Sequence, residues 1–170
     1  TKIDTTHLPL FVQEIDLSTT GIARGKGGIC ANNNKVFGSS WKGEFFIYDN
    51  KGAKRLNLEL PINKILKTAL KSDFLRVHDI ACRTNENTNS TTVFMSFDHV
   101  ENGMRDVTVS KFNIQENSGR YSYSDWDVVY RSKKWRDDNN GNPAGRLKLL
   151  NNGDLLLSVA SPSDTYDGVT

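Results

Sequence analysis

Residues 126–164 read WDVVYRSKKWRDDNNGNPAGRLKLLNNGDLLLSVASPSD, and their alternation of apolar runs with turn-forming residues decides the fold class. Residues 146–150 and 155–159 are two short apolar runs on either side of the tetrapeptide Asn-Asn-Gly-Asp at 151–154. Two β-type runs joined by a short Asn/Gly segment predict a β-hairpin. The polar residues 137–141 cannot continue the strand expected at residues 126–130, so they predict a loop.

The same alternation of apolar runs with turn-forming segments occurs twice more upstream, which indicates repeated sheet units. In the first unit the expected strands are residues 8–17, 29–31, 35–38, 44–48 and 56–60. In the second unit they are residues 76–82, 91–97, 106–114 and 126–130, and the third unit begins at Gly145. Successive antiparallel strands form meanders, from which propeller blades are built. We therefore predict an all-β fold, a partial β-propeller of about three meander blades. The one helical pattern, with apolar residues at helical spacing, is short and covers residues 61–70.

Composition supports this prediction and excludes other classes of protein. The chain has 170 residues, enough for a real core, and 36% of them are hydrophobic. Its mean hydropathy is -0.53, so the apolar residues must be concentrated in short strands. Lys and Arg (22) nearly balance Asp and Glu (20) and are interspersed with them, so no basic block argues for nucleic acid. We expect residues 1–170 to form a single β-propeller-like domain.

Neither a membrane span nor a targeting segment is expected from the sequence. No run approaches the roughly 18 apolar residues of a membrane helix, and no apolar segment of a signal peptide begins the chain. The chain starts at Thr1 and stops shortly after a predicted strand. We therefore expect both ends to be cut and the domain to be a piece of a larger propeller.

Several of these motifs carry a resemblance to a known family. Residues 145–148 (GRLK) with residues 152–155 (NGDL) resemble the inner hairpin of soluble quinoprotein glucose/sorbosone dehydrogenases, also called aldose sugar dehydrogenases. Residues 79–81, 92–96 and 109–112 look like the preceding blade of that family, and the order agrees over residues 74–161. The resemblance implies a six-bladed propeller of the periplasm or the extracellular space, of which this chain is the N-terminal part. Relatives of this kind use pyrroloquinoline quinone (PQQ) and calcium.

The catalytic base of that family is missing from the matching position. The family pattern is His-x-x-Gly-Arg-Leu, and here Asn142 stands in the place of the histidine. An amide cannot accept a proton near neutral pH, whereas a neutral histidine can. The resemblance places the cofactor and calcium ligands in later blades. We therefore expect no cofactor in this chain, with PQQ and calcium belonging to a full-length relative.

The candidate site residues are His78, Asp79, Asn142 and Arg146. His78 and Asp79 lie on a predicted inner strand facing the channel, so we expect His78, Asn142 and Arg146 to line one concave surface. We expect Arg146 to be held there by a carboxylate or by backbone carbonyls. The alternative is structural: His78 satisfies a backbone carbonyl and Asp79 caps a turn, because neighbours on a strand point to opposite faces. His7 and His99 have no partners in the pattern, and the histidines match no metal-ligand set.

Other residues each have two interpretations. Cys30 and Cys82 are either a disulfide between neighbouring inner strands or two buried thiols. The loop 21–28, with Arg24 and Lys26, is either a flexible connection or a site for an anionic ligand at the channel mouth. Asn89 begins the glycosylation triplet Asn89-Ser90-Thr91, a pattern that also arises by chance. Five aromatic residues either stack on a carbohydrate or fill the wedge between blades, and we favour the wedge: Trp41, Tyr121, Tyr123, Trp126 and Trp135.

Two functions follow from these observations. The first is a binding or assembly module outside the cytoplasm, in which open edge strands recruit the C-terminal blades or another protein chain. The alternative is a PQQ-dependent sugar or alcohol dehydrogenase of which this chain is the N-terminal part. Asn142 favours the first.

We predict that the chain by itself does not oxidise sugars when PQQ and calcium are supplied. Asn142 replaces the base, and loss of a positioned general base costs about 10²–10⁴ in rate. The measurement is dye-linked sugar oxidation by the purified chain. Oxidation that is abolished by Asn142→Ala would contradict the prediction.

Overall fold

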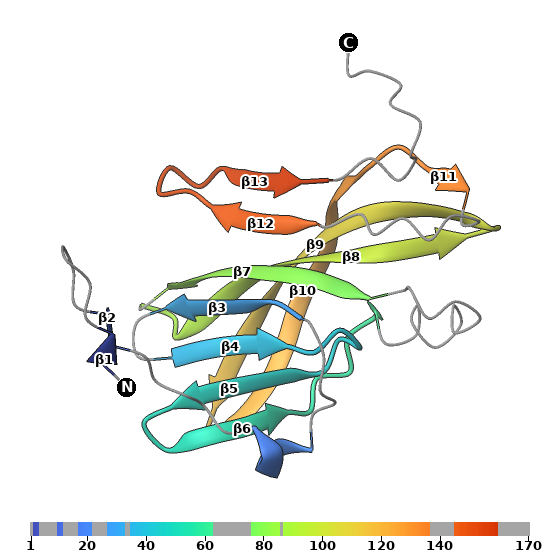
Figure 1. Cartoon of the computed structure of the whole chain (residues 1–170). Coiled ribbons are helices and arrows are strands. Elements are labelled where there is room, and N and C mark those ends of the chain that lie inside the picture. Colours follow the sequence, from blue (N-terminus) through green and yellow to red (C-terminus); the bar gives the residue numbers. More distant parts are fainter. Residues whose placement is uncertain are drawn as a thin grey trace.

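The computed structural model shows an all-β protein built from antiparallel sheets (Figure 1). It describes residues 2–3, 10–11, 17–21, 27–32, 35–62, 76–85, 87–136 and 145–159. Within these residues, helix is limited to one 3-10 turn, η1 (Ser18–Thr20), and the single residue Ile62. The prediction of an all-β fold with almost no helix is confirmed for the described part of the chain.

Three sheets follow one another along the chain, and apart from β11 their strands pair in sequence order. The first sheet consists of β3 (Ile29–Asn32), β4 (Lys35–Ser39), β5 (Phe45–Asp49) and β6 (Gly52–Leu56). The second sheet consists of β7 (Val77–Asn85), β8 (Ser90–Glu101), β9 (Met104–Asn117) and β10 (Arg120–Arg131), with β11 (Trp135–Arg136) paired to the start of β9. The third sheet is the hairpin of β12 (Arg146–Leu149) and β13 (Leu155–Ser158). A separate ribbon pairs β1 (Lys2–Ile3) with β2 (Leu10–Phe11).

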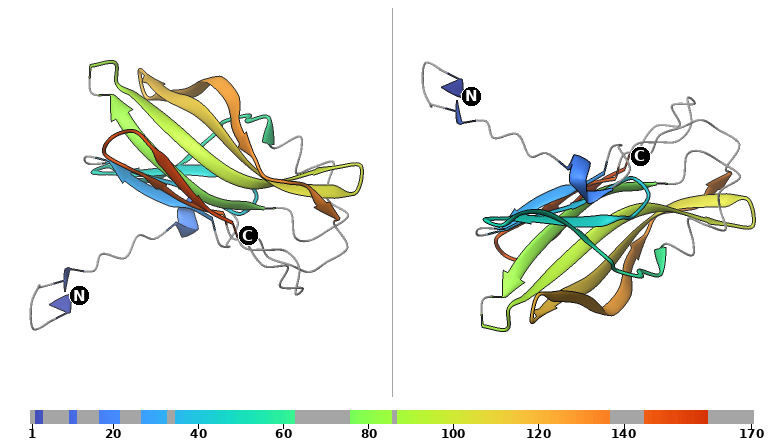
Figure 2. Two further views of the ribbon diagram at one scale, coloured as in Figure 1. Left: turned by 90° about the horizontal axis from the view of Figure 1, so that it is seen from above. Right: turned by 90° about the horizontal axis from the view of Figure 1, so that it is seen from below.

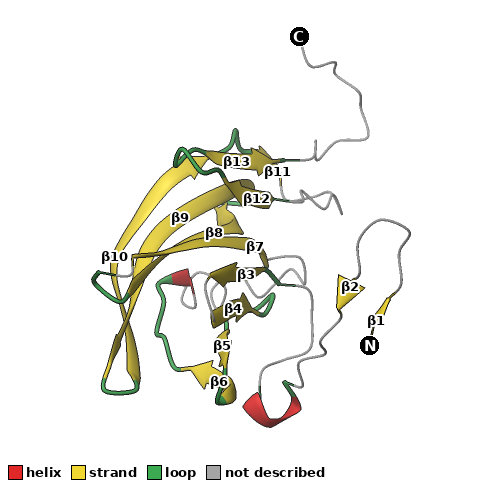
Figure 3. Ribbon diagram, turned by 90° about the vertical axis from the view of Figure 1, so that its left-hand side faces the viewer, coloured by secondary structure: helices red, strands yellow, loops and turns green. Residues whose placement is uncertain are grey.

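The main core lies between the first and second sheets, and Figure 3 shows the second sheet curving around the first. Phe45 of β5 meets Phe112 of β9 edge to face, with ring centroids 5.8 Å apart. Full burial of such a side chain contributes about 1.5–3 kcal/mol. Each sheet supplies seven residues to the buried cluster: Phe37, Phe45, Ile47, Leu56, Leu58, Leu60 and Ile62 from the first sheet and the segment after it, and Val77, Ile80, Val93, Met95, Phe97, Phe112 and Ile114 from the second.

Three aromatic residues of β10 pack against this core. Trp126 stacks on Phe112 at a centroid distance of 5.2 Å and lies 6.2 Å from Phe97. Tyr121 and Tyr123 also pack against the buried cluster. The packing interpretation is confirmed for these three residues, which fill the space between the sheets.

The first strands of the three sheets, β3, β7 and β12, lie side by side (Figure 1). Gly28, the residue before β3, packs closely on β7. A Cβ atom at this position would come within 2.1 Å of the Ile80 backbone nitrogen. Only glycine permits this approach. A disulfide joins Cys30 of β3 to Cys82 of β7, with Cα atoms 5.9 Å apart. The structure therefore has the bridge, and the alternative of two buried thiols is wrong.

Surface side chains also connect the first and second sheets. Lys35 of β4 forms an ion pair with Glu116 of β9 at 3.0 Å, and the hydrogen bond that it donates lowers the pKa of Glu116. Burial and the neighbouring Glu116 charge raise the pKa of Tyr121 to about 12. The Lys54 ammonium lies 5.4 Å from the centroid of the Tyr121 ring.

Two turns lengthen the second sheet beyond the strands expected from the sequence. Glu101 pairs with Met104, so Asn102 and Gly103 form a two-residue turn, with φ angles of 53° and 72°. Asn117 pairs with Arg120 in the same way. Two-residue turns with two positive φ angles match the twist of the flanking strands. The strands expected at 91–97, 106–114 and 126–130 are therefore parts of longer strands.

The fourth strand of the first sheet was expected at residues 56–60, and this prediction is wrong. Asp49 pairs with Gly52, so β6 begins immediately after a two-residue turn. The Asp49 carboxylate accepts a hydrogen bond from the Lys51 backbone amide and closes that turn. Residues 56–60 still alternate between buried and exposed, although their backbone leaves the sheet after Leu56, where the Leu58 amide donates to the Leu56 carbonyl.

Several expectations fall outside the described residues. These are the helical pattern beyond Ile62, most of the strand expected at 8–17, the loop cations Arg24 and Lys26, and Asn142. His7 and the side chain of Trp135 are also outside them.

We predict that replacing both cysteines by alanine lowers the free energy of unfolding by about 2–4 kcal/mol, because the bridge restrains a 52-residue separation in the unfolded chain. Urea titration with and without a reductant measures the effect. The reductant should lower the midpoint of the natural chain and leave that of the Cys30→Ala, Cys82→Ala variant unchanged. Equal midpoints for the two oxidised proteins would contradict the prediction.

Candidate functional site

An apolar groove of about 700 Å³ lies between the second and third sheets. Its walls are apolar side chains from β8, β9, β10 and β13 and from the residue after β13: Phe94, Val109, Val129, Tyr130, Leu155, Leu157 and Val159. Val129 and Tyr130 are 44% and 46% exposed, which is unusual for large apolar side chains that cluster together. Exposed apolar clusters of this kind occur at protein–protein contacts, at membrane-binding surfaces and in ligand-binding grooves.

Leu155 and Leu157 of β13 line the groove, and the outer edge of β13 differs from the outer edges of the other two sheets. β6 carries the exposed cations Lys54 and Arg55. β10 has two register shifts and a positive φ angle at Asp125. Charges and bulges on an edge strand discourage pairing with another chain. β13 has the sequence LLLS and pairs only with β12 in the described part of the chain. This strand has neither a charged residue nor a bulge.

The β12–β13 hairpin is positioned by polar contacts to the second sheet. Asp79 of β7 accepts a hydrogen bond from the Leu147 backbone amide at 3.0 Å, and the Arg146 guanidinium lies 3.9 Å from the same carboxylate oxygen. The Ser96 hydroxyl donates to the Gly145 carbonyl. A Cβ atom at Gly145 would lie 3.2 Å from the Ser96 side chain, so the small residue lets the hairpin approach. These contacts fix one wall of the groove.

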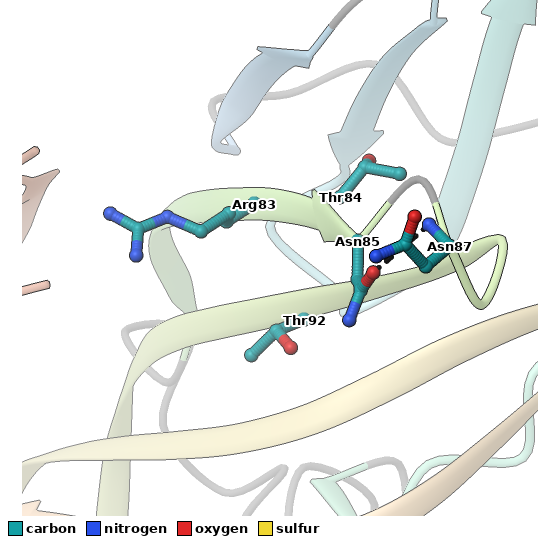
Figure 4. A pocket seen from close by; sticks show the side chains of 5 residues that line it. All are labelled: Arg83, Thr84, Asn85, Asn87 and Thr92. Carbon is teal, nitrogen blue, oxygen red and sulfur yellow. Dashed lines mark hydrogen bonds between the residues drawn. The ribbon is translucent and has the colours of Figure 1, made fainter.

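The far end of the hairpin is held by Arg83, which donates hydrogen bonds to the Leu150 and Asn151 carbonyls at 2.8 and 3.4 Å. Arg83 also borders an open polar hollow of about 510 Å³ at the end of β7. Figure 4 shows its other lining side chains, Thr84, Asn85, Asn87 and Thr92. Asn85 accepts a hydrogen bond from the Asn87 backbone amide, and Thr92 donates to Asn113, so these side chains serve the turn and the sheet.

A buried histidine–carboxylate pair lies near the start of β7. The His78 Nε2 atom is 2.8 Å from the Asp98 carboxylate, with the two side chains 5% and 1% exposed. The Arg105 guanidinium lies 4.0 Å from the other oxygen of Asp98. The register shift between Val77 and Asp79 marks a β-bulge, which re-aims side chains out of strict alternation. His78 therefore meets a carboxylate of β8.

A second buried pair was missed in the sequence. His99 Nδ1 lies 3.3 Å from Asp106, whose side chain is fully buried, and 3.0 Å from the Arg131 guanidinium. His99 and Asp106 are direct partners across β8 and β9. The Asn102-Gly103 turn sets this register, and it is the signal that could have found the pair. The expectation that His99 has no partner is wrong.

The candidates from the sequence therefore occupy different surroundings. His78 pairs with Asp98 inside the second sheet, and the Asp79 carboxylate accepts from the Ile80 and Leu147 amides. The Arg146 side chain is 71% exposed and lies beside Asp79. Asn142 is outside the described residues, so the concave surface expected from these side chains stays a prediction.

The described residues contain neither a metal-binding cluster nor a membrane-spanning helix. In the part of the chain that the structure describes, no group of three or more His, Cys, Asp or Glu side chains is arranged to hold a metal ion. None of its helical residues forms a segment with the length and apolar character needed to cross a bilayer.

We predict that Asp98→Asn lowers the free energy of unfolding by about 3–5 kcal/mol, because it removes the negative charge that faces the buried Arg105 guanidinium. Asp127→Asn, on the exposed part of β10, is the matched control and should change it by less than about 0.5 kcal/mol. Urea denaturation of the two variants compares them. Similar losses for both would show that Asp98 is not part of an energetically coupled pair.

Comparisons with family models, with curated proteins and with solved structures each found no match to this chain. The resemblance to quinoprotein dehydrogenases therefore stays a prediction that depends on the sequence motifs.

Proposed function

We propose that this chain is a binding or assembly module that acts outside the cytoplasm, built as about three blades of a β-propeller. The segment that it binds is an extended strand of a second protein chain with apolar side chains at alternate positions. This strand pairs with the outer edge of β13 and places its apolar side chains in the groove. The groove beside an unguarded strand edge is the observation that carries the proposal.

The chemistry of the groove matches an extended strand better than a small polar ligand. A strand alternates its side chains between two faces, so every second residue of an added strand points toward Val129 and Leu157. Backbone hydrogen bonds to β13 supply affinity, and the apolar pockets supply specificity. The described groove lining contains no acid, base or nucleophile other than the Tyr130 hydroxyl.

The arrangement of β3, β7 and β12 supports the propeller part of the proposal. In a propeller the first strand of each blade lies nearest the axis, and the following strands lie farther out. The three sheets follow this order, each as a meander that begins at a neighbouring first strand. The disulfide supports a location outside the cytoplasm, because such bridges persist in oxidising compartments.

The dehydrogenase alternative is weaker on the described residues. The Nε2 atom of His78 faces Asp98, and both carboxylate oxygens of Asp79 accept backbone amides. These groups therefore act in holding β7, β8 and β12 together. Asn142 supplies no base, as argued from the sequence.

We predict that Leu157→Lys weakens strand binding at least tenfold, which is about 1.4 kcal/mol, whereas Leu156→Lys does not. The two residues are neighbours on β13, but Leu157 lines the groove and Leu156 is 55% exposed without lining it. The probe is a synthetic eight-residue peptide with Val and Tyr at alternate positions and Thr and Lys between them. Its scrambled counterpart, with helical spacing of the apolar residues, is the control.

The measurement is NMR titration of the isotope-labelled chain, with hydrogen exchange at the β13 amides as a second readout. Chemical shifts of β12 report that the hairpin is intact in both variants. Equal affinities for the two variants, or equal binding of the scrambled peptide, would refute the proposal. Self-association that Leu157→Lys abolishes would identify a second copy of the chain as the occupant instead.

A further inference from the structure

The turn between β7 and β8 carries a feature that the proposed function does not use. Asn89-Ser90-Thr91 is the one Asn-X-Ser/Thr triplet in the 170-residue sequence. Asn85 pairs with Ser90, so Asn89 is the last residue of the turn before β8 begins. This triplet is the acceptor pattern for N-linked glycans when it lies on the surface of a secreted protein.

The geometry presents the Asn89 side chain to solvent. Asn89 is exposed, and its φ angle of 48° lies in the left-handed region, which asparagine tolerates better than most residues. Its amide makes no hydrogen bond to any residue in the described part of the chain, whereas Asn85 accepts one inside the turn. Figure 2 shows this turn projecting from one end of the sheets.

A second observation supports passage through a secretory compartment. The Cys30–Cys82 disulfide forms where thiols are oxidised, and glycan transfer takes place in the same kind of compartment. The modification is also compatible with strand binding, because the β7–β8 turn contributes no residue to the groove.

We propose that Asn89 is an N-glycosylation site. The Asn89 amide nitrogen displaces the diphosphate of a lipid-diphosphate-linked oligosaccharide at its first sugar carbon. A C–N bond forms, the C–O bond to the carrier breaks, the amide nitrogen loses one proton, and the lipid diphosphate leaves. Thr91 is only 4% exposed in the folded chain, and its hydroxyl lies 2.9 Å from that of Thr84. Transfer that needs this hydroxyl must therefore precede the pairing of β7 with β8.

The test is secretion of the whole chain from eukaryotic cells, followed by intact-mass measurement before and after treatment with a peptide N-glycosidase. The expected result is one glycan on the natural chain and on Thr91→Ser, which keeps the hydroxyl. Asn89→Asp keeps a residue that tolerates the left-handed conformation, and it should carry no glycan. Asn87→Asp is the matched control from the same turn, outside the triplet, and should be glycosylated like the natural chain.

Two further comparisons make the proposal falsifiable. Urea midpoints of the non-glycosylated Asn89→Asp and natural chains should agree, which separates loss of the acceptor from loss of the fold. Purified folded chain incubated with the transferring enzyme and its lipid-linked donor should stay unmodified, whereas chain kept unfolded should accept the glycan. Secretion of the disulfide-bonded natural chain without a glycan, or a glycan that persists in Asn89→Asp, would overturn the proposal. Equal modification of folded and unfolded chain would overturn the proposed order of events.

Discussion

The close approach of the first strands is the constraint on which the rest of the structure depends. β3 can lie against β7 because Gly28 has no side chain where the Ile80 backbone passes. The Cys30–Cys82 bridge then fixes this pair, and Asp79 fixes β12 through the Leu147 amide. With the first strands in place, the outer strands of the first two sheets face each other and enclose the aromatic core around Phe112. The same arrangement leaves the space beside β13 as a groove.

The fold class could be predicted because its signals are local. The Asn-Asn-Gly-Asp segment at 151–154 and the apolar runs beside it specify a hairpin without reference to the rest of the chain. Strand lengths could not be predicted as well, because the Asn102-Gly103 and Ser118-Gly119 turns decide where pairing starts, and both lie outside the strands expected from the sequence. The strand expected at residues 56–60 lies instead at Gly52–Leu56 for the same reason, because the turn before β6 has only two residues.

The candidate site depends on contacts between sheets, and a single sequence does not contain this information. Nothing near Phe94 or Val129 indicates that Leu157, from another sheet, completes the same groove. The two histidine–carboxylate pairs differ in how far the sequence could have predicted them. His99 meets Asp106 by register alone, whereas His78 reaches Asp98 only because a bulge breaks the alternation of β7. Sequence reasoning that assumes strict alternation cannot find the second kind of contact.

The disulfide also decides how the chain carries mechanical force. Residues 31–81 lie between the bridged cysteines and include the whole of β4, β5 and β6. A pulling force applied to the two ends of the chain passes from β3 through the sulfur atoms directly to β7. The strands inside the loop bear none of this tension, so stretching extends the segments outside the bridge while β4, β5 and β6 keep their paired structure. A module tethered at both ends would therefore present a mechanically shielded first sheet, whereas the β12–β13 hairpin and the surface beside it lie on the part of the chain that carries the load.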